Sequence, residues 1–590
     1  MHQMRTLLPF VLRYRGRLLA GLLFAAAAAG TTAALPLVIR DVVNLLDTRG
    51  VVPGEVLRLS AIMLGIGLVD SLLRFGQRLT VNGTSYLVEF DIREAQFAKL
   101  LTLDQRFFGR NHTGDLMTRV TNDLSAVRMF LGPGLNSLMT AILILTIAGA
   151  LMFRTNPMLA SIVLLLLPLV SVLFVIIGGR MRVVFRGVQD QFGGLSTRAQ
   201  ENFSGIRTIK AYAQEDAEIE VFAAANEQYR ALNVRYVLLS GLLWPAISVL
   251  LGLVGALVLL LGGRFVAGGT MSLGDLVLFN SYLALLAFPM IALGWTVNLY
   301  QQCVASLDRI GEVLHHQPAV TSPAEAQEIR ELVGEIEFRN VGIRFDYEEA
   351  EQKQQSSSDW LLRDISFHVP RGTSLAIVGA TGAGKTTLVN LLARVRDPDE
   401  GQVLIDGHDV RELPLAELRR TIGYVPQDTF LFSLPVRENV VFGRPEASND
   451  DVERALTISR LSNDVEQFPD GIDTMIGERG VTLSGGQKQR TAIARAVLRE
   501  PAILVLDDSL ASVDTHTAAQ ILSGLREVMQ GRTSIIIAQR VATVKDADQI
   551  VVLHGGQIAE RGTHQHLVAA NGQYAAMYRR ELLEAELDEK

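Results

Sequence analysis

The first half of the chain alternates long apolar stretches with polar segments that have a helical pattern. Six of the apolar stretches reach the length of about 20 residues that an α-helix needs to cross a bilayer. They cover approximately residues 18–39, 59–79, 134–153, 157–177, 237–262 and 273–299. The second stretch is the weakest, because Asp70 and Arg74 interrupt it. The pattern predicts an α-helical transmembrane domain with six spans over residues 1–315.

The segments between the spans differ in length and in charge. Those after spans two and four, about residues 80–133 and 178–236, are long and rich in arginine, so we expect the helices of spans two to five to continue well beyond the bilayer. Short cytoplasmic loops carry an excess of basic residues. The segment before span one contains four arginines, which are Arg5, Arg13, Arg15 and Arg17. This places the N-terminus, and after six spans the rest of the chain, on the cytoplasmic side of the membrane.

Two features inside the spans have open interpretations. Asp70 is an intramembrane carboxylate and therefore a functional candidate, but it is equally placed to form an ion pair with Arg74 on the same helix face. Phe288-Pro289, with Trp244-Pro245 and Trp295, could line a cavity. Proline kinks and lipid-facing aromatic residues are common in membrane helices, which favours the simpler interpretation.

After the sixth span the polarity changes, and strand-like apolar runs alternate with helical ones, as in an α/β domain. Residues 316–334 contain Pro318 and Pro323 and predict a linker. The α/β domain is expected over residues 335–580, followed by an acidic C-terminal tail over residues 581–590. The 590-residue chain is 49% hydrophobic, and its net charge of −7 argues against nucleic acid as a partner.

A glycine-rich loop between a strand-like run and a helical run is the strongest chemical signal in the chain. The loop consists of Gly379, Ala380, Thr381, Gly382, Ala383, Gly384, Lys385, Thr386 and Thr387. Glycines allow backbone N–H groups to face an anion, and the start of the following helix adds the positive end of its dipole. Lys385 would reach the terminal phosphates of a nucleotide, and the Thr386 hydroxyl would bind Mg²⁺.

Further signals follow this loop in a fixed order. Gln427 ends a short strand-like run, from which its amide could reach Mg²⁺, and Asp507 and Asp508 end a buried one. A second anion-binding arrangement, Ser-Gly-Gly at the start of a helical run, lies within Leu483, Ser484, Gly485, Gly486 and Gln487. Each signal alone is weak, but together and in this order they are specific.

With these motifs, nearly the whole chain resembles the ATP-binding-cassette (ABC) transporters, and in particular exporter half-transporters, in which six spans precede one P-loop α/β cassette. The resemblance implies that residues 379–387 are the Walker A loop and that Gln427 is the Q-loop glutamine. Residues 483–487 correspond to the signature motif, which acts on ATP bound by a partner subunit. Asp507 corresponds to the Walker B aspartate and, with Thr386 and Gln427, would hold Mg²⁺.

Two further positions are implied by the same resemblance. The aromatic residue that stacks on adenine is Phe345 or Tyr347, because the register favours the first and a polar insert over residues 348–359 leaves the second possible. Asp514 corresponds to the D-loop aspartate.

Two residues depart from the family pattern at the same chemical step. The family usually has glutamate directly after the Walker B aspartate, where this chain has Asp508, and histidine after Ile-Ile-Ala, where it has Gln539. A general base must lie within hydrogen-bond reach of the attacking water, and aspartate is one methylene shorter than glutamate. Glutamine cannot act as a protonated imidazole. We therefore expect a site that binds Mg-ATP well and hydrolyses it slowly.

This combination resembles the degenerate-site subunit of heterodimeric bacterial multidrug exporters. The hypothesis is an ATP-driven exporter of amphiphilic drug-like or lipid-like molecules, embedded in the lipid bilayer of a plasma (inner) membrane, whose second half-transporter carries the catalytic glutamate and histidine. Two alternatives remain open. One is a homodimeric exporter that uses Asp508 as a weak base, and the other is an ATP-binding regulatory or channel-like membrane protein.

Overall fold

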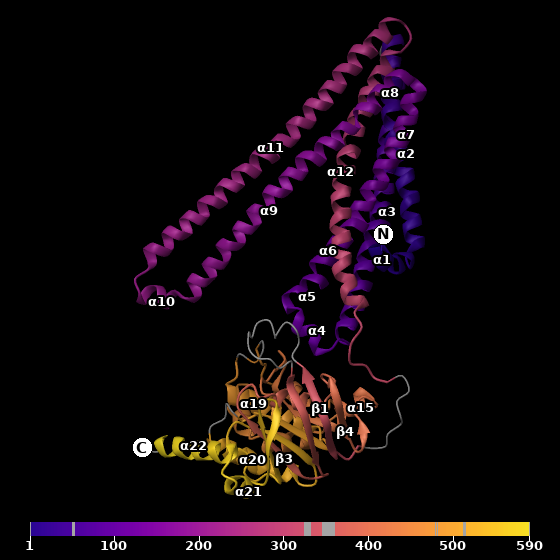
Figure 1. Ribbon diagram of the computed structural model, residues 1–590. Coiled ribbons are helices and arrows are strands. Elements are labelled where there is room, and N and C mark those ends of the chain that lie inside the picture. Colours follow the sequence, from indigo (N-terminus) through magenta and orange to yellow (C-terminus); the bar gives the residue numbers. More distant parts are fainter. Residues whose placement is uncertain are drawn as a thin grey trace. The chain divides into compact units, whose positions relative to one another are not determined.

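The computed structural model describes residues 2–49, 53–323, 332–344, 360–477, 480, 482–510 and 515–588. The chain forms two compact units (Figure 1). The first comprises Met1–Thr102 and Asn111–His316, and the second comprises Leu103–Arg110 and Gln317–Lys590. The second unit therefore includes a short piece of chain from the membrane half of the sequence.

The described part of the first unit consists of helices. Their bounds are α1 (His2–Leu12), α2 (Arg15–Arg49), α3 (Pro53–Leu100), α5 (Thr113–Val120), α6 (Asn122–Met129), α7 (Leu135–Thr155), α8 (Pro157–Leu166), α9 (Pro168–Ser204), α10 (Ile206–Ala211), α11 (Glu215–Ala267) and α12 (Leu273–His315), with a π-helical turn at Phe130–Gly134. Within the described residues, six helical segments are long and apolar enough to cross a membrane. The predicted six-span helical domain is thus confirmed.

Helix α12 provides much of the core of this unit, where it packs against α2, α7, α9 and α11. Leu278, Phe279 and Tyr282 are fully buried on it. The Tyr282 hydroxyl donates a hydrogen bond of 2.8 Å to the backbone oxygen of Ala33 on α2. A buried hydroxyl needs such an acceptor, because leaving it unpaired in an apolar interior costs free energy. These contacts hold α12 against α2.

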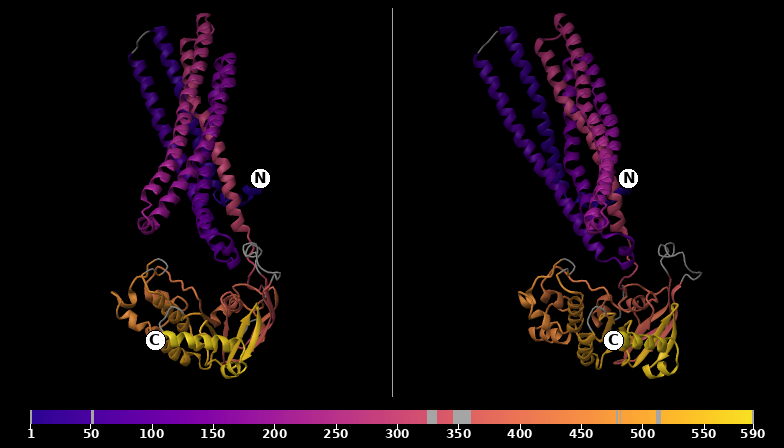
Figure 2. Two further views of the ribbon diagram at one scale, coloured as in Figure 1. Left: turned by 60° about the vertical axis from the view of Figure 1, so that its left-hand side comes forward. Right: turned by 90° about the vertical axis from the view of Figure 1, so that its left-hand side faces the viewer.

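Helices α9 and α11 form a long hairpin closed by α10, and they run side by side in Figures 1 and 2. The part of the hairpin beyond residue 177 lies outside the spans expected from the sequence. Large apolar side chains on this part have exposed fractions between 41% and 77%: Val183, Phe185, Phe192, Phe203, Ile206, Tyr212 and Ile219. An exposed apolar surface of this extent is unusual on a part of a protein that is in contact with water.

Two sheets form the framework of the second unit. A four-stranded antiparallel sheet has the order β2-β1-β4-β5, and a six-stranded sheet has the order β10-β9-β3-β8-β7-β6. The strands are β1 (Ile336–Arg344), β2 (Trp360–Val369), β3 (Ser374–Gly379), β4 (Glu400–Ile405), β5 (His408–Asp409), β6 (Ile422–Val425), β7 (Ile503–Asp507), β8 (Thr533–Ile537), β9 (Gln549–His554) and β10 (Gln557–Gly562). The larger sheet is parallel except for its edge strand β10.

Helices cover these sheets and extend the unit. They are α4 (Gln105–Arg110), α14 (Lys385–Asn390), α15 (Leu415–Thr421), α16 (Val436–Val441), α17 (Asn449–Ile458), α18 (Ser462–Val465), α19 (Gly485–Leu498), α20 (Thr515–Met529), α21 (His564–Ala569) and α22 (Gln573–Asp588), with short 3₁₀ turns at Gly471–Asp473 and Val541–Thr543. Ile493 of α19 and Ile521 of α20 pack in one core with Leu506 of β7. Glu581, where we expected an acidic tail to begin, lies inside α22.

The short piece from the membrane half, which contains α4, contacts the second unit through polar groups. Arg106 Nη2 lies 3.5 Å from Asp399 Oδ1, and the backbone N–H of Ala319 donates a hydrogen bond of 2.8 Å to Asp104 Oδ2. Burial raises the pKa of Asp399, but hydrogen bonds and nearby guanidinium groups outweigh this and lower the pKa overall. Asp399 is therefore a stable negative partner for Arg106 at neutral pH.

Candidate nucleotide-binding site

The parallel arrangement of the larger sheet brings the predicted chemistry to one edge. Neighbouring parallel strands end at the same edge, which is where ligands bind in open α/β sheets. Gly379 ends β3 and Asp507 ends β7, while Gln427 and Gln539 each lie two residues beyond the ends of β6 and β8. Residues separated by more than 100 positions in the sequence thus meet in space.

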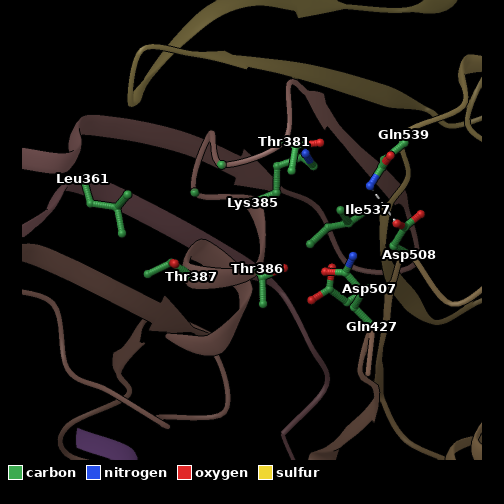
Figure 3. Close-up of a pocket in the computed structure, with 12 residues that line it drawn as sticks. Leu361, Thr381, Lys385, Thr386, Thr387, Gln427, Asp507, Asp508, Ile537 and Gln539 are labelled. Atoms are coloured by element: carbon green, nitrogen blue, oxygen red, sulfur yellow. Dashed lines mark hydrogen bonds between the residues drawn. The ribbon is translucent and has the colours of Figure 1, made fainter. Parts of the chain in front are cut away.

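These loops surround a cavity of about 270 Å³, which Figure 3 shows in close-up. Its lining residues are Leu361, Thr381, Gly382, Gly384, Lys385, Thr386, Thr387, Gln427, Asp507, Asp508, Ile537 and Gln539. All except Leu361 and Ile537 were predicted as site residues. Those two are ordinary apolar residues of β2 and β8, so no sequence motif could have marked them. Gly379, Ala380 and Ala383 belong to the same loop but do not line the cavity.

The glycine loop requires glycine at two positions in particular. At Gly379, φ is +155° and a Cβ atom would lie 2.4 Å from the backbone oxygen of Leu553. At Gly384, φ is +90° and a Cβ atom would lie 2.7 Å from Leu362 Cδ2. Helix α14 begins directly after Gly384, so the first-turn N–H groups, which have no partner within a helix, lie at the cavity wall.

Lys385 is a buried cation at this wall. Its Nζ donates hydrogen bonds to the backbone oxygens of Gly379 at 2.8 Å and Ala380 at 3.0 Å. Burial lowers the pKa of Lys385, and the charges of Asp508 and Asp507 oppose this shift. A poorly solvated cation is stabilised when an anion binds next to it, so Lys385 is suited to bind phosphate.

Asp507 is 1% exposed, and its two carboxylate oxygens have different surroundings. The Tyr424 hydroxyl donates a hydrogen bond of 3.3 Å to Oδ2, whereas Oδ1 has no hydrogen-bond partner within the described residues. Burial raises the pKa of Asp507, and the nearby hydroxyl groups of Thr386 and Tyr424 oppose the rise. An unpaired buried carboxylate oxygen indicates a ligand, because leaving it without a partner costs free energy.

The oxygen atoms around Asp507 fit a Mg²⁺ ion. The Thr386 hydroxyl and the Gln427 amide line the same cavity as Asp507. Mg²⁺ in proteins is usually bound by one or two carboxylates together with substrate phosphates and water. The described residues contain no cluster of three or more His, Cys, Asp or Glu side chains that could hold a metal by themselves. A bound Mg²⁺ would neutralise charge on the phosphates.

The two residues that depart from the family pattern are hydrogen-bonded to each other. Gln539 Nε2 donates a hydrogen bond of 3.0 Å to Asp508 Oδ2, and Figure 3 shows this contact at the cavity wall. Asp508 has φ +45°, a left-handed conformation that aspartate tolerates better than most residues. Its backbone N–H donates to the Ile537 oxygen at 2.9 Å. The carboxylate of Asp508 is therefore fixed from both its backbone and its side chain.

The predicted signature residues form the start of α19. Ser484 Oγ accepts from the Gln487 backbone N–H at 3.2 Å, and Gln487 Oε1 accepts from the Ser484 N–H at 2.9 Å, which is a capping box. Gln487 also contacts Asp464 of α18, which forms a close ion pair with Arg490. Ser484 and Gly485 are exposed, while Leu483 packs on the small core of this region. The helix start is thus rigid and open to solvent.

Three predicted site residues, Phe345, Tyr347 and Asp514, lie outside the described residues, as does the polar insert over residues 348–359. The choice between the two adenine-stacking candidates is therefore still a prediction from the sequence.

Comparison with known proteins identifies the family. Residues 18–290 match the family model for the ABC transporter transmembrane region, and residues 362–511 match the family model for the ABC transporter. A relative from Bacillus subtilis, the probable multidrug resistance ABC transporter ATP-binding/permease protein YheI, is 38% identical over 85% of this chain and 84% of its own length. The chain belongs to the ABC transporters.

Other relatives of this ABC transporter cover almost its full length. The multidrug resistance-like ATP-binding protein MdlA of Escherichia coli is 35% identical over 94% of this chain and 92% of its own. A solved bacterial Atm1-family ABC exporter with ATP bound has 29% identity and a TM-score of 0.77, and the match covers 96% of this chain and 98% of that one. The chain is thus an exporter-type half-transporter: a multi-pass membrane domain fused to the ATP-binding domain of a transport ATPase.

Proposed function

We propose that this chain is the degenerate-site subunit of a heterodimeric ABC exporter. In this proposal residues 379–387 hold the phosphates of ATP, and Thr386, Gln427 and Asp507 hold Mg²⁺. Hydrolysis at this site is slow. The observation that carries the proposal is the hydrogen bond between Gln539 and Asp508.

The physical argument concerns the general base. Asp508 occupies the position from which a carboxylate would accept a proton from the attacking water, but its side chain is short and is held by Gln539 Nε2 at 3.0 Å. A displacement near 1 Å from the productive position costs on the order of 10²-fold in rate. Gln539 is neutral and cannot provide the charge of an imidazolium. Binding of ATP does not depend on either group, because Lys385 and the glycine loop supply the phosphate contacts.

Two exposed surfaces of this chain support the proposal that it binds a partner subunit. The start of α19 is rigid and exposed, as needed for contact with ATP bound on another cassette. The outer half of the α9–α11 hairpin exposes apolar side chains such as Phe203, at 77%, and Tyr212, at 73%. A second half-transporter with an intact glutamate and histidine would cover the hairpin and carry out most of the hydrolysis.

The proposal places the ATP-binding domain in the cytoplasm and the spans in the plasma membrane. ATP binding would close the two cassettes, and the membrane helices would then change from inward to outward access. The substrate class is amphiphilic molecules, drug-like or lipid-like, consistent with the multidrug names of two relatives.

The test is ATPase activity of the full chain in two forms: purified alone, and co-purified with the half-transporter encoded beside it. We expect negligible activity alone and strong activity together. Replacing the partner's catalytic glutamate by glutamine should reduce the activity of the complex by about 10²–10⁴-fold, the usual contribution of a general base. Asp508→Asn should change it less than about twofold, since that group contributes little.

A gain-of-function variant separates the proposal from its alternatives. In the chain alone, the double change Asp508→Glu with Gln539→His should raise phosphate release by about 10-fold or more, and adding Lys385→Ala should abolish the gain. Strong activity of the unmodified chain alone that Asp508→Asn removes would instead identify a homodimer with an aspartate base. ATP binding without ATP-dependent movement of any amphiphile, even in the complex, would identify a regulatory or channel-like protein.

A further inference from the structure

Another cavity, lined by both polar and apolar side chains, lies in the membrane unit and is open to the surface of the described chain at Arg78 and Phe288. It has a volume of about 280 Å³ and is lined by residues of α3, α7 and α12. Its polar lining includes Arg74, Gln77 and Arg78 of α3 with Asn136 of α7, and its apolar lining includes Phe288 and Pro289 of α12. Ionisable side chains between membrane helices are rare and commonly mark the path of a substrate.

The charge of this cavity is unbalanced. Its lining contains two arginines and no carboxylate. Arg74 is partly neutralised, because its Nε lies 2.6 Å from Asp70 Oδ2 and its Nη2 donates to Thr32 Oγ1 at 2.7 Å. Arg78, one turn further along the same helix face, takes part in no hydrogen bond or ion pair within the described residues. The cavity therefore has an excess of positive charge centred on Arg78.

Asn136 adds an unsatisfied polar group. Its Oδ1 atom is buried and has no hydrogen-bond partner among the described residues. By contrast, the neighbouring Gln77 donates from Nε2 to Thr140 Oγ1 at 2.9 Å. Buried amide oxygens nearly always have a partner, so Asn136 is a group that a ligand with a hydroxyl donor would satisfy. A singly ionised phosphate monoester has such a donor, whereas a carboxylate does not.

The opposite side of the cavity is apolar. Phe288 is 72% exposed, and Leu285, Pro289 and Ala292 of the same helix line the cavity with Ile144 of α7. The lining therefore has a cationic side and a hydrocarbon side. Such a division suits an amphiphile better than a small ion, because a free ion gains nothing from the apolar side.

The position of the two arginines along α3 also agrees with binding of an amphiphile. Arg74 and Arg78 lie at the end of the second span that the sequence places on the cytoplasmic side. Headgroups of the inner leaflet lie at this depth, so a molecule entering from that leaflet would bring its headgroup to Arg78 and its chain to Phe288.

We infer that this cavity binds the anionic headgroup of an amphiphile, a carboxylate or a phosphate monoester, with Arg78 as the main cationic contact. The guanidinium group matches both headgroups, because it can donate two parallel hydrogen bonds to a pair of their oxygens. This inference rests on the proposed exporter function and narrows its substrate class from amphiphiles in general to anionic ones.

The test is binding of radiolabelled dodecyl phosphate to the full chain in nanodiscs of zwitterionic phosphatidylcholine, without ATP. Arg78→Gln should weaken binding by at least about 10-fold, as expected when one hydrogen-bonded charge is lost, and Arg78→Lys should recover part of it. Arg58→Gln is the matched control, because Arg58 is an exposed arginine on α3 outside the cavity. It should leave binding unchanged.

A competition series on the unmodified protein tests the same inference without any variant. Dodecanoate should displace the probe, whereas dodecanol and dodecyltrimethylammonium should not. Equal displacement by the cationic or neutral amphiphile would overturn the inference. Displacement by inorganic phosphate at the concentration at which dodecyl phosphate acts would also overturn it, because the cavity would then take free anions. None of these outcomes depends on ATP hydrolysis, so failure here is distinguishable from failure of the proposed exporter function.

Discussion

Asp507 and Asp508 are adjacent carboxylates at the end of one strand, but they have different partners. Asp508 is held by Gln539, whereas Asp507 keeps one buried oxygen without a partner among the described residues. Both identities were predictable from the sequence, since each follows a recognisable buried run. Their contacts were not, because Tyr424 lies on β6 and Gln539 follows β8, and these residues meet the carboxylates only when the sheet forms.

Asp507→Asn should stabilise the protein in the absence of divalent cations. Burial raises the pKa of the Asp507 carboxyl above its ordinary value of 3.8, so the folded state is penalised once this group ionises, and the penalty is complete at pH values above the folded pKa. We expect the unfolding midpoint at pH 7 in EDTA to rise by about 2–4 °C, which corresponds to roughly 1 kcal/mol.

The gain in Asp507→Asn should shrink as the pH falls towards the folded pKa, because the wild-type carboxyl is then protonated as well. Stabilisation by Mg-ATP should disappear in the same variant. Differential scanning fluorimetry over a series of falling pH values that starts at pH 7, with and without Mg-ATP, measures both effects. A variant that is less stable than the wild type in EDTA at pH 7 would contradict this account of Asp507.

At the scale of elements, the C-terminal helix α22 is connected to the segment that carries Gln539. Glu581 Oε2 accepts from the Val541 backbone N–H at 2.6 Å, and Oε1 accepts from the Ala542 N–H at 3.2 Å. These N–H groups begin the 3₁₀ turn that follows Gln539. The acidic composition of the C-terminal segment did not predict this role of Glu581, because the role depends on a contact between residues 40 positions apart.

Glu581→Ala should destabilise this turn. It removes a charged acceptor from two backbone N–H groups, which costs about 1–3 kcal/mol. The unfolding midpoint of the full chain should fall by several degrees. In Glu581→Gln, which keeps one acceptor oxygen, the midpoint should fall less. Leu583→Ala on the same helix is the control, because Leu583 is 61% exposed and should have little effect. Equal losses in the alanine variants at 581 and 583 would show that the carboxylate contributes nothing specific.

For the whole molecule, the sequence predicted the six spans and the α/β cassette because both depend on local patterns of polarity and glycine. The sequence also marked Phe107-Phe108 as the tip of a long helical segment and therefore as a contact point for the cassette, and residues 103–110 belong to the same compact unit as the cassette. It did not predict which residues make the contact. The contact that connects them, Arg106 with Asp399, joins residues 293 positions apart. Neither residue lies in a recognisable motif, so only the folded chain reveals their contact.

Arg106→Gln should loosen the segment over residues 103–110. A partly exposed ion pair contributes up to about 1 kcal/mol, so amide hydrogen exchange in this segment should accelerate by about two- to fivefold. Exchange in the strands of the larger sheet should not change. Arg110→Gln is the matched control, since Arg110 is an exposed arginine on the same short helix. Mass spectrometry of peptides from this segment makes the measurement, and acceleration in both variants would show that the ion pair does not hold it.

The apolar side chains on the part of the α9–α11 hairpin beyond residue 177 also affect how much of this protein the cell retains. In the heterodimer that we propose, a subunit made without its partner would carry Phe203, Tyr212 and their neighbours uncovered beyond the membrane. Cellular chaperones and proteases act on such surfaces, so excess copies would be removed while paired copies persist. The two halves would then be kept in equal number by degradation of the surplus, without matched rates of synthesis.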